Sequence, residues 1–268
     1  MAPPFLAIQS VTKRFAGPTG MPIEVLRPMS LEIARGEFVV FLGPSGCGKT
    51  TLMRMVGGLD QPSDGTIRLE GQVVREPDRR RGMVFQSYSS FPWLTVGQNV
   101  AFGLRYRDDL GPEEKAKRTR DYLALVGLVE FADAWPSRIS GGMRQRVAIA
   151  RTLAAGPDVL LMDEPFGALD AQTREFLQAQ LLEIQEREHK TIIFVTHDVE
   201  EAVFLADRIV VFSARPARIL EEIPVVDLLG HDRTLATRET EAFFRLRNRI
   251  LHLIRVEARR AEPEGLPA

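Results

Sequence analysis

Residues 43–50 have the spacing of a loop that wraps phosphate groups. They follow an apolar segment, 37–42, that we expect to be a buried strand, and they precede a segment with helical spacing, 50–59. Small residues let backbone N–H groups face an anion, and the start of the following helix adds the positive end of its dipole. The loop consists of Gly43, Pro44, Ser45, Gly46, Cys47, Gly48, Lys49 and Thr50. The sequence therefore predicts a phosphate-binding site here.

Three side chains of this loop have separate expected roles. Lys49 is predicted to lie between the β- and γ-phosphates of a nucleotide. The Thr50 hydroxyl is predicted to ligate Mg²⁺. We interpret Cys47 as a small filler of the loop without a catalytic role.

A second apolar segment ends in two acids. Residues 159–162 run into Asp163 and Glu164, and an unpaired carboxylate is costly to bury. Acids at the end of a buried strand therefore usually face a site. We expect Asp163 to hold Mg²⁺, directly or through water, and Glu164 to polarise an attacking water. The alternative is a strand end that reaches solvent.

Two further apolar segments end in polar side chains. Residues 191–196 lead to His197, for which we predict a contact with the γ-phosphate, although a lone histidine is more often structural. Residues 82–85 lead to Gln86, whose amide is expected to contact Mg²⁺ or water. Taken alone, Gln86 is an ordinary glutamine at the end of a strand.

The elements that position these residues alternate between strand and helix. Short apolar runs bounded by glycine, proline or charge predict strands that are buried on both faces, and helical segments such as 171–187 separate them. This order predicts an α/β fold with a mostly parallel sheet. Looser alternation over 6–15 and 24–34 predicts an antiparallel edge sheet, and the region around 87–153 predicts a helical insertion.

The chain is expected to divide into three parts. Residues 1–86 and 156–229 form the α/β core with its antiparallel sheet, 87–155 form the helical subdomain, and 230–268 form a C-terminal helical extension. Within the extension we interpret the segment 241–259 as a helix packed on the core, rather than one that lies on anionic lipid. Its apolar residues form one stripe: Phe243, Leu246, Ile250, Leu253 and Ile254.

Composition excludes several classes of protein. With 35 Lys and Arg against 36 Asp and Glu, the chain lacks the charge of a dedicated nucleic-acid binder, and no nucleic-acid partner is expected. The single cysteine and the absence of a secretory signal at the start favour a reducing cytosol. No apolar run approaches the roughly 20 residues that cross a bilayer. Any role at a membrane is therefore expected to come through a partner.

The segment Ser140-Gly-Gly-Met-Arg-Gln-Arg146 adds a motif of a different kind. Together with the phosphate loop, the acidic pair and His197, in this order, it makes the chain resemble the nucleotide-binding subunit of an ATP-binding cassette (ABC) transporter. The resemblance implies a P-loop NTPase core, ATP as the nucleotide and Mg²⁺ as the metal.

The resemblance also implies a role for each matching residue. The signature binds the γ-phosphate of ATP held by the opposite subunit in this family, which implies a head-to-tail homodimer that sandwiches two ATP molecules. The matching residues are Phe15 for adenine stacking, Thr51 beside Thr50 in the phosphate loop, Gln86 of the Q-loop, Ser140, Gly141 and Gly142 of the signature, Asp163 for Mg²⁺, Glu164 as the catalytic glutamate, Asp170 of the D-loop and His197 as the switch histidine.

Three positions depart from the commonest family pattern without removing a phosphate ligand: Ile139, Met143 and Gly167. Met143, Gly167 and the stretch 91–96 resemble the nitrate, sulfonate and taurine importer branch. Within that stretch, Trp93 is either a docking residue for a membrane subunit or part of the core of the helical subdomain.

The resemblance implies an ATP-hydrolysing subunit that energises a bacterial importer of nitrate, sulfonate, taurine or a related small organic anion. Its implied partners are two integral-membrane permease subunits and, indirectly, an extracytoplasmic substrate-binding protein. The implied location is peripheral, at the cytoplasmic face of the bacterial inner membrane. One alternative is an ABC subunit with another cargo, such as lipid or a pyrimidine precursor. Another is a soluble cassette ATPase of DNA repair or translation, which the lack of cysteine clusters and sustained heptads disfavours.

Overall fold

The computed structural model describes residues 4–18, 20–86 and 90–261. The chain forms two compact units, of which the first comprises residues 1–77 and 193–268 and the second comprises 78–192. Strand β8 (Thr191–Thr196) contains the boundary between them. The three-part division made from the sequence stays a prediction.

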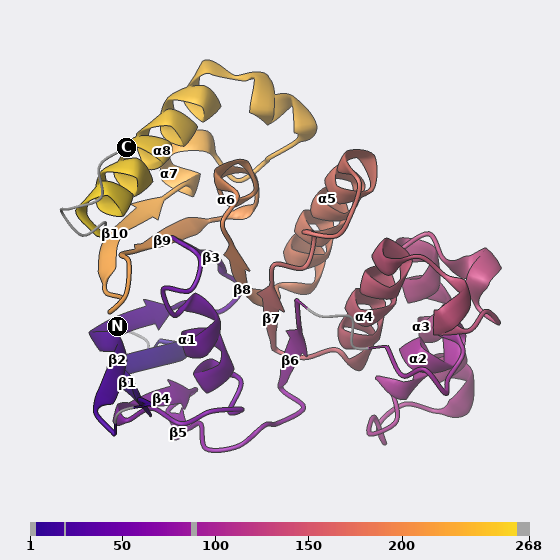
Figure 1. Ribbon diagram of the computed structural model, residues 1–268. Helices are drawn as coiled ribbons and strands as arrows, with labels where there is room; N and C mark the ends of the chain where they lie inside the picture. Colours follow the sequence, from indigo (N-terminus) through magenta and orange to yellow (C-terminus); the bar gives the residue numbers. More distant parts are fainter. Residues whose placement is uncertain (1–3, 19, 87–89, 262–268) are drawn as a thin grey trace. The chain divides into compact units, whose positions relative to one another are not determined.

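An antiparallel sheet of four strands lies in the first unit, in the order β2-β1-β4-β5 (Figure 1). Along β2, Met29, Leu31 and Ile33 are buried and the residues between them are exposed, which is the period of two expected for a sheet with one covered face. In the register, Leu6 lies opposite both Ile33 and Leu69. The strands are β1 (Leu6–Ala16), β2 (Pro22–Ile33), β4 (Asp64–Leu69) and β5 (Gln72–Val73).

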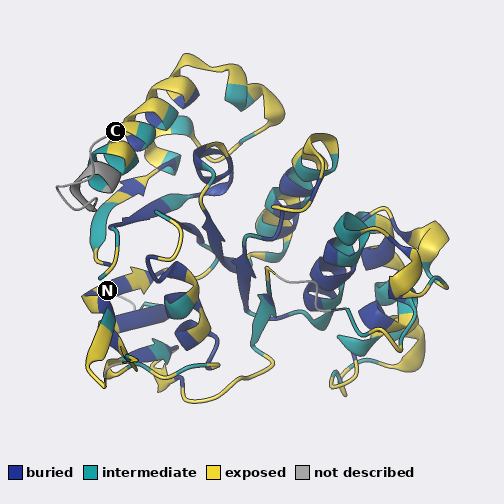
Figure 2. Cartoon of the chain, viewed as in Figure 1, coloured by how far each residue is buried: buried dark blue, intermediate teal, exposed yellow. Residues whose placement is uncertain are grey.

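The first unit also holds a second group of strands, two of which are buried along their whole length. These strands lie side by side in the order β10, β9, β3, β8. Strand β9 is parallel to β3 and antiparallel to β10. Every residue of β3 and β8 is buried (Figure 2), which explains why their sequences are continuous apolar runs. The remaining elements are β3 (Phe38–Leu42), β9 (Arg208–Phe212), β10 (Ile219–Pro224), α1 (Lys49–Val56), α6 (Val199–Leu205), α7 (Val226–Leu229), the 3-10 helix Leu235–Glu239 and α8 (Glu241–Ala261).

Helix α8 packs on α6 through the stripe read from the sequence. Phe243 and Ile250 are buried there, while Leu253 and Ile254 are only half-buried. Three arginines of α8 pair with acids of the same unit: Arg247 with Glu200 at 2.7 Å, Arg249 with Glu221 and Arg245 with Glu241. This packing and pairing confirm the interpretation of a helix that is packed on the core.

The second unit combines a parallel strand pair with helices. β6 (Arg81–Val84) runs parallel to β7 (Val159–Asp163). Helix α3 begins with a proline and has two glutamates in its first turn, and α4 ends at Gly156 in the left-handed conformation, so both helices carry regular start and stop signals. The helices are α2 (Val96–Phe102), α3 (Pro112–Leu125), α4 (Gly141–Ala155), α5 (Ala171–Glu188) and the 3-10 helices Val129–Phe131 and Pro136–Arg138.

The structure confirms the predicted α/β class, with parallel strand pairs, an antiparallel β sheet and a helical region in the second unit. Within the described ranges, no helix is both long and apolar enough to span a bilayer.

Candidate functional site

The predicted site residues are divided between the two units. Phe15, the phosphate loop 43–51 and His197 lie in the first unit. The second unit holds Gln86, Ser140, Gly141, Gly142, Asp163, Glu164 and Asp170.

The phosphate loop connects the end of β3 to the start of α1, and its shape requires glycine at three positions. A Cβ added to Gly43 would lie 2.8 Å from the carbonyl oxygen of Phe212, too close for any side chain. Gly48 has φ +124° and an added Cβ would lie 2.6 Å from Leu26 Cδ2. Gly46 has φ +71°, a left-handed conformation that L side chains rarely adopt. The loop conformation is therefore specified by backbone sterics.

Lys49 is held by the backbone of its own loop. Its side chain is 4% exposed, and the ammonium donates hydrogen bonds to the carbonyl oxygens of Gly43, at 2.7 Å, and Pro44, at 2.8 Å. The Cys47 sulfur lies 3.8 Å from the same ammonium and is buried, so Cys47 fills space inside the loop. A positive charge is thus fixed within the loop.

Helix α1 begins at Gly48 without a side-chain hydrogen bond to its first turn, and that turn contains no acidic residue. The first N–H groups of a helix have no partner within the helix, and they carry the positive end of its dipole. Thr50 is exposed in this turn and Thr51 is half-buried. The loop and this helix start together make a site that favours an anion.

Phe15 lies on β1 opposite Ile23 of β2, and its side chain is 43% exposed. The Lys13 ammonium lies 4.8 Å from the centre of the Phe15 ring, which is within cation–π distance. Lys13 is itself fixed by a 2.6 Å ion pair with Asp60. An aromatic ring held in this way has exposed surface for stacking on a base.

His197 is exposed directly after β8, between two residues that are fixed by hydrogen bonds. The Thr196 hydroxyl donates to Glu201 at 2.7 Å and accepts from the backbone N–H of Asp198 at 3.0 Å. The Asp198 carboxylate in turn caps α6 by accepting from the N–H groups of Glu200 and Glu201. The backbone on both sides of His197 is therefore well anchored.

In the second unit, the structure brings Gln86 and Glu164 together. The Gln86 amide donates a 3.0 Å hydrogen bond from Nε2 to Glu164 Oε2. Glu164 has φ +44°, and a non-glycine residue in this region costs about 1–3 kcal/mol that the surrounding structure must offset. The neighbouring Asp163 is 5% exposed at the end of β7. Backbone strain of this kind concentrates at functional sites.

Ser140, Gly141 and Gly142 form the start of α4. The Ser140 hydroxyl accepts a 3.2 Å hydrogen bond from the backbone N–H of Met143 and caps the helix. A Cβ added to Gly142 would lie 3.2 Å from Leu169 Cδ2, a tight approach. This helix start is capped by a neutral group, so its dipole is not offset by charge.

Asp170 caps α5 with a carboxylate. Its Oδ1 accepts a 2.9 Å hydrogen bond from the backbone N–H of Thr173. This hydrogen bond, with a smaller contribution from the charge of Arg146, lowers the pKa of Asp170 below its usual value. Burial in turn lowers the pKa of Arg146, against the opposing attraction of Asp170.

One feature was not foreseen, and one alternative left open by the sequence is decided. Arg215, which carries no recognisable sequence signal, donates from Nη2 to the carbonyl oxygen of Gly46 in the phosphate loop at 2.9 Å. Trp93 is 68% exposed, so the interpretation of Trp93 as a core residue is wrong. Its ring contacts Phe91 with a centroid separation of 5.5 Å.

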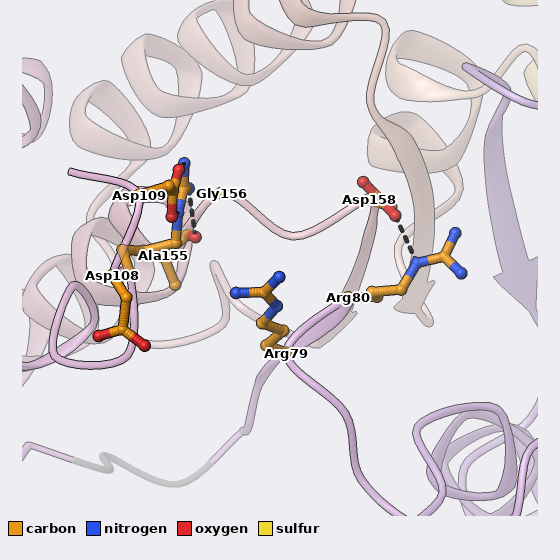
Figure 3. A pocket seen from close by; sticks show the side chains of 8 residues that line it. Arg79, Arg80, Asp108, Asp109, Ala155, Gly156 and Asp158 are labelled. Carbon is orange, nitrogen blue, oxygen red and sulfur yellow. Dashed lines mark hydrogen bonds and ion pairs between the residues drawn. The ribbon is translucent and has the colours of Figure 1, made fainter.

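A pocket of about 660 Å³ lies in the second unit, away from every predicted site residue (Figure 3). Its walls are held by two ion pairs, Arg80 with Asp158 at 2.7 Å and Arg107 with Asp109 at 2.6 Å. Three arginines and three aspartates line it, so the pocket has no dominant charge.

Comparisons with known proteins identify relatives over nearly the whole chain. The family model described as "ABC transporter" matches residues 26–167. The nitrate import ATP-binding protein NrtD of Synechocystis sp. is 46% identical, over 93% of this chain and 95% of that protein. An uncharacterized ABC transporter ATP-binding protein of Methanocaldococcus jannaschii is 47% identical, over 94% and 92%. The bicarbonate transport ATP-binding protein CmpC of Synechococcus elongatus is 43% identical, over 95% of this chain and 39% of that protein.

Solved structures support the same assignment. A dimeric post-hydrolysis state of an ATP-binding cassette, bound to ADP and phosphate, matches with a TM-score of 0.75 and 34% sequence identity. The match covers 82% of this chain and 98% of that cassette. It confirms the predicted P-loop NTPase fold.

Proposed function

Because the chain belongs to the ABC transporter family of ATP-binding subunits, an ATPase family, we propose that it hydrolyses ATP to energise bacterial import of a small anion. The observation that carries this proposal is the 46% identity to a nitrate import ATP-binding protein along nearly the full length of both chains. The 43% identity to a bicarbonate transport protein adds a second small oxyanion. The resemblance to the nitrate, sulfonate and taurine importer branch means that small organic anions are also candidate cargo.

In the first unit, the phosphate loop 43–51 binds the phosphates of ATP. Its backbone N–H groups and the uncapped start of α1 donate to phosphate oxygens, and Lys49 offsets the charge of the β- and γ-phosphates. Phe15 stacks on adenine through its exposed ring, and His197 contacts the γ-phosphate. Transfer of the γ-phosphoryl group to water yields ADP and phosphate.

In the second unit, Glu164 orients the attacking water and accepts its proton. The hydrogen bond from Gln86 to Oε2 holds the carboxylate in a fixed orientation, as a general base that acts on water requires. The positive φ of Glu164 directs its side chain differently from the preceding strand residues, which alternate between the faces of the sheet. The buried apolar strand β7 is thus followed directly by the reacting carboxylate of Glu164.

The proposed metal is Mg²⁺, held by Thr50, Gln86 and Asp163. A hydroxyl, an amide oxygen and a carboxylate are the hard oxygen donors that Mg²⁺ takes, and Asp163 supplies a nearly buried carboxylate. Bound Mg²⁺ neutralises charge that develops on the phosphates.

Two copies of the chain are proposed to form a head-to-tail homodimer around two ATP molecules. The start of α4 supports this role because Ser140, Gly141 and Gly142 present N–H donors and an uncharged cap to an anion. Asp170 lies at the start of α5 in the same unit, where its carboxylate caps that helix. The dimeric ADP-bound cassette supports the proposal by similarity.

The proposed partners are two integral-membrane permease subunits and, through them, an extracytoplasmic substrate-binding protein. The proposed location is the cytoplasmic face of the bacterial inner membrane. The exposed Trp93, next to Phe91, is proposed as a docking residue for a permease subunit, since exposed tryptophan is enriched at interfaces.

The test is native purification of this chain from detergent-solubilised membranes of its own source, with mass spectrometry of the proteins that copurify. A polytopic membrane protein is the expected result. Recovery of ribosomes, nucleic acid or only proteins without membrane spans would contradict the importer proposal and leave the ATPase chemistry standing. A matched Trp93→Ala variant is expected to lose the membrane protein, whereas Trp135→Ala, another exposed tryptophan, is expected to retain it.

Cargo is then tested by reconstituting the chain and its permease in liposomes with candidate binding proteins. We expect ATPase activity to rise when a binding protein loaded with nitrate, bicarbonate or a sulfonate is added. Stimulation only by a lipid or a neutral solute would contradict the assignment of a small anion.

A further inference from the structure

The phosphate loop is supported from outside by two neighbouring parts of the first unit. At its start, Gly43 packs against the carbonyl oxygen of Phe212, the last residue of β9. At its end, Gly48 packs against Val25 and Leu26 of β2, with 2.6 Å between an added Cβ and Leu26 Cδ2. The loop therefore lies directly against the end of β9 and the middle of β2.

The hairpin between β9 and β10, residues 213–218, is fastened to both of these supports. Its base is closed by two 3.0 Å hydrogen bonds, from Ser213 N–H to the Arg218 carbonyl oxygen and from Arg218 N–H to the Ser213 hydroxyl. Ala217 joins it to β2: its N–H donates to the Val25 carbonyl oxygen at 2.8 Å, and its carbonyl oxygen accepts from Arg27 N–H at 2.9 Å. The hairpin is thus joined to β2 by hydrogen bonds beside the phosphate loop.

Arg215 extends from this hairpin to the middle of the loop. Its Nη2 donates a 2.9 Å hydrogen bond to the carbonyl oxygen of Gly46, the residue with φ +71°. A trans peptide directs its C=O and N–H in opposite directions, so a donor that holds the Gly46 oxygen also sets the direction of the Cys47 N–H. That N–H donates to the Pro44 carbonyl oxygen at 3.4 Å, a long hydrogen bond that a phosphate oxygen can replace.

We propose that Arg215 is a positioning residue of the phosphate loop: by holding the Gly46 carbonyl oxygen, it orients the loop N–H groups toward the phosphates of the nucleotide. The proposal rests on the assignment of residues 43–51 as the nucleotide site. It adds a third anchor, at the middle of the loop, to the steric contacts at Gly43 and Gly48. The anchor comes from a hairpin that is far from the loop in sequence.

The experiment measures the dissociation constants of ATP and ADP for the isolated full chain and three variants at Arg215 and Arg218. Arg215→Ala is expected to weaken the binding of both nucleotides about three- to tenfold, within the range for the net contribution of a typical hydrogen bond. Arg215→Lys keeps a donor of similar reach and is expected to stay within about twofold of the unmodified chain. Arg218→Ala removes the same charge from the same exposed hairpin and is expected to leave both constants unchanged.

Three further readouts separate positioning from stability and from long-range charge. The melting temperature without nucleotide is expected to be equal in Arg215→Ala and Arg218→Ala. The affinity loss in Arg215→Ala is expected to persist at high salt, where attraction between exposed charges is screened. In ATPase assays, the loss is expected in KM, with kcat nearly unchanged, because the reacting carboxylate Glu164 is untouched.

The proposal would be overturned if Arg215→Ala bound ATP as tightly as the unmodified chain. It would also be overturned if Arg218→Ala lost as much affinity as Arg215→Ala, or if Arg215→Lys bound ATP as weakly as Arg215→Ala. Lys49→Ala serves as the reference for the nucleotide site itself. If Lys49→Ala binds ATP normally, the assignment of the site fails. If Lys49→Ala loses ATP and Arg215→Ala does not, only the positioning role fails.

Discussion

Helices α1 and α5 both begin at predicted site residues, but they satisfy their first N–H groups in opposite ways. Helix α1 begins at Gly48 with no side-chain cap and no acid in its first turn, whereas α5 begins with the carboxylate of Asp170, which accepts from Thr173 N–H. Helix α4 is intermediate, because the neutral hydroxyl of Ser140 caps it. An acidic side chain offsets the dipole from within, so a helix start attracts an external anion only where such a side chain is missing.

The comparison separates roles that the sequence motifs alone leave undivided. All three helix starts carry motif residues, but their caps predict a phosphate at α1, a weaker phosphate contact at α4 and a structural role at α5. Substitutions that change how one of these helix starts is capped or charged test the comparison directly.

The largest effect is expected from blocking the start of α4. Ser140→Arg removes the cap and places a long side chain over the N–H donors, so we expect kcat for ATP hydrolysis to fall more than about a hundredfold, as when transition-state donors are lost. The ATP affinity of the isolated chain, measured by calorimetry, is expected to change little, because in the proposed homodimer α4 contacts the nucleotide of the other copy. An equal loss of ATP affinity would mean that α4 binds nucleotide in its own chain.

The next effect is expected from placing an acid beside the start of α1. Ser45 is exposed in the phosphate loop, and Ser45→Asp would set a carboxylate near the phosphates, which costs several kcal/mol where like charges meet. We expect ATP to bind at least about tenfold more weakly, while Ser45→Asn, of similar size without charge, is much less affected. Equal binding by the Asp and Asn variants would contradict the anion site at α1.

The smallest effect is expected at α5. The lowered pKa of Asp170 means that its capping stabilises the fold above the unfolded-state pKa of about 3.9 and that this contribution is lost as pH falls through the lower folded-state pKa. Asp170→Ser keeps a cap without a titrating group. We therefore expect the difference in melting temperature between the two chains to shrink below about pH 4. A difference that is independent of pH would show that the carboxylate of Asp170 does not cap α5.

Much of the fold was predictable because its signals are local. Helix α3 lies within the predicted helical insertion and has proline and acids at its start. The predicted strands 37–42 and 159–162 match β3 and β7 within one residue. Helix α2 was missed, although Thr95 and Gln98 form a capping box that marks its start. Strand β10 was also missed, because its two glutamates interrupt the apolar run. It forms a strand because it pairs with β9, a contact that the local pattern does not show.

The site was predictable in its residue types and less so in its geometry. The positive φ of Glu164 and its hydrogen bond to Gln86 depend on how β6 and β7 end, which residue types do not encode. The contact between Arg215 and Gly46 joins segments that are 169 positions apart. The exposure of Trp93 was also not predictable from the sequence, because tryptophan occurs in cores and at surfaces alike and only the packing decides between them.

The central claim is that two copies of this chain close around ATP, with the α1 start of one copy and the α4 start of the other on the same phosphates. Glu164→Gln tests it most directly, since the amide keeps the size of the side chain and removes the base, which slows turnover about a hundredfold or more. Light scattering in saturating ATP and Mg²⁺ is expected to give the mass of two 30.0 kDa chains, and the mass of one chain in ADP. A single-chain mass in ATP, with ATP shown to be bound, would contradict the account.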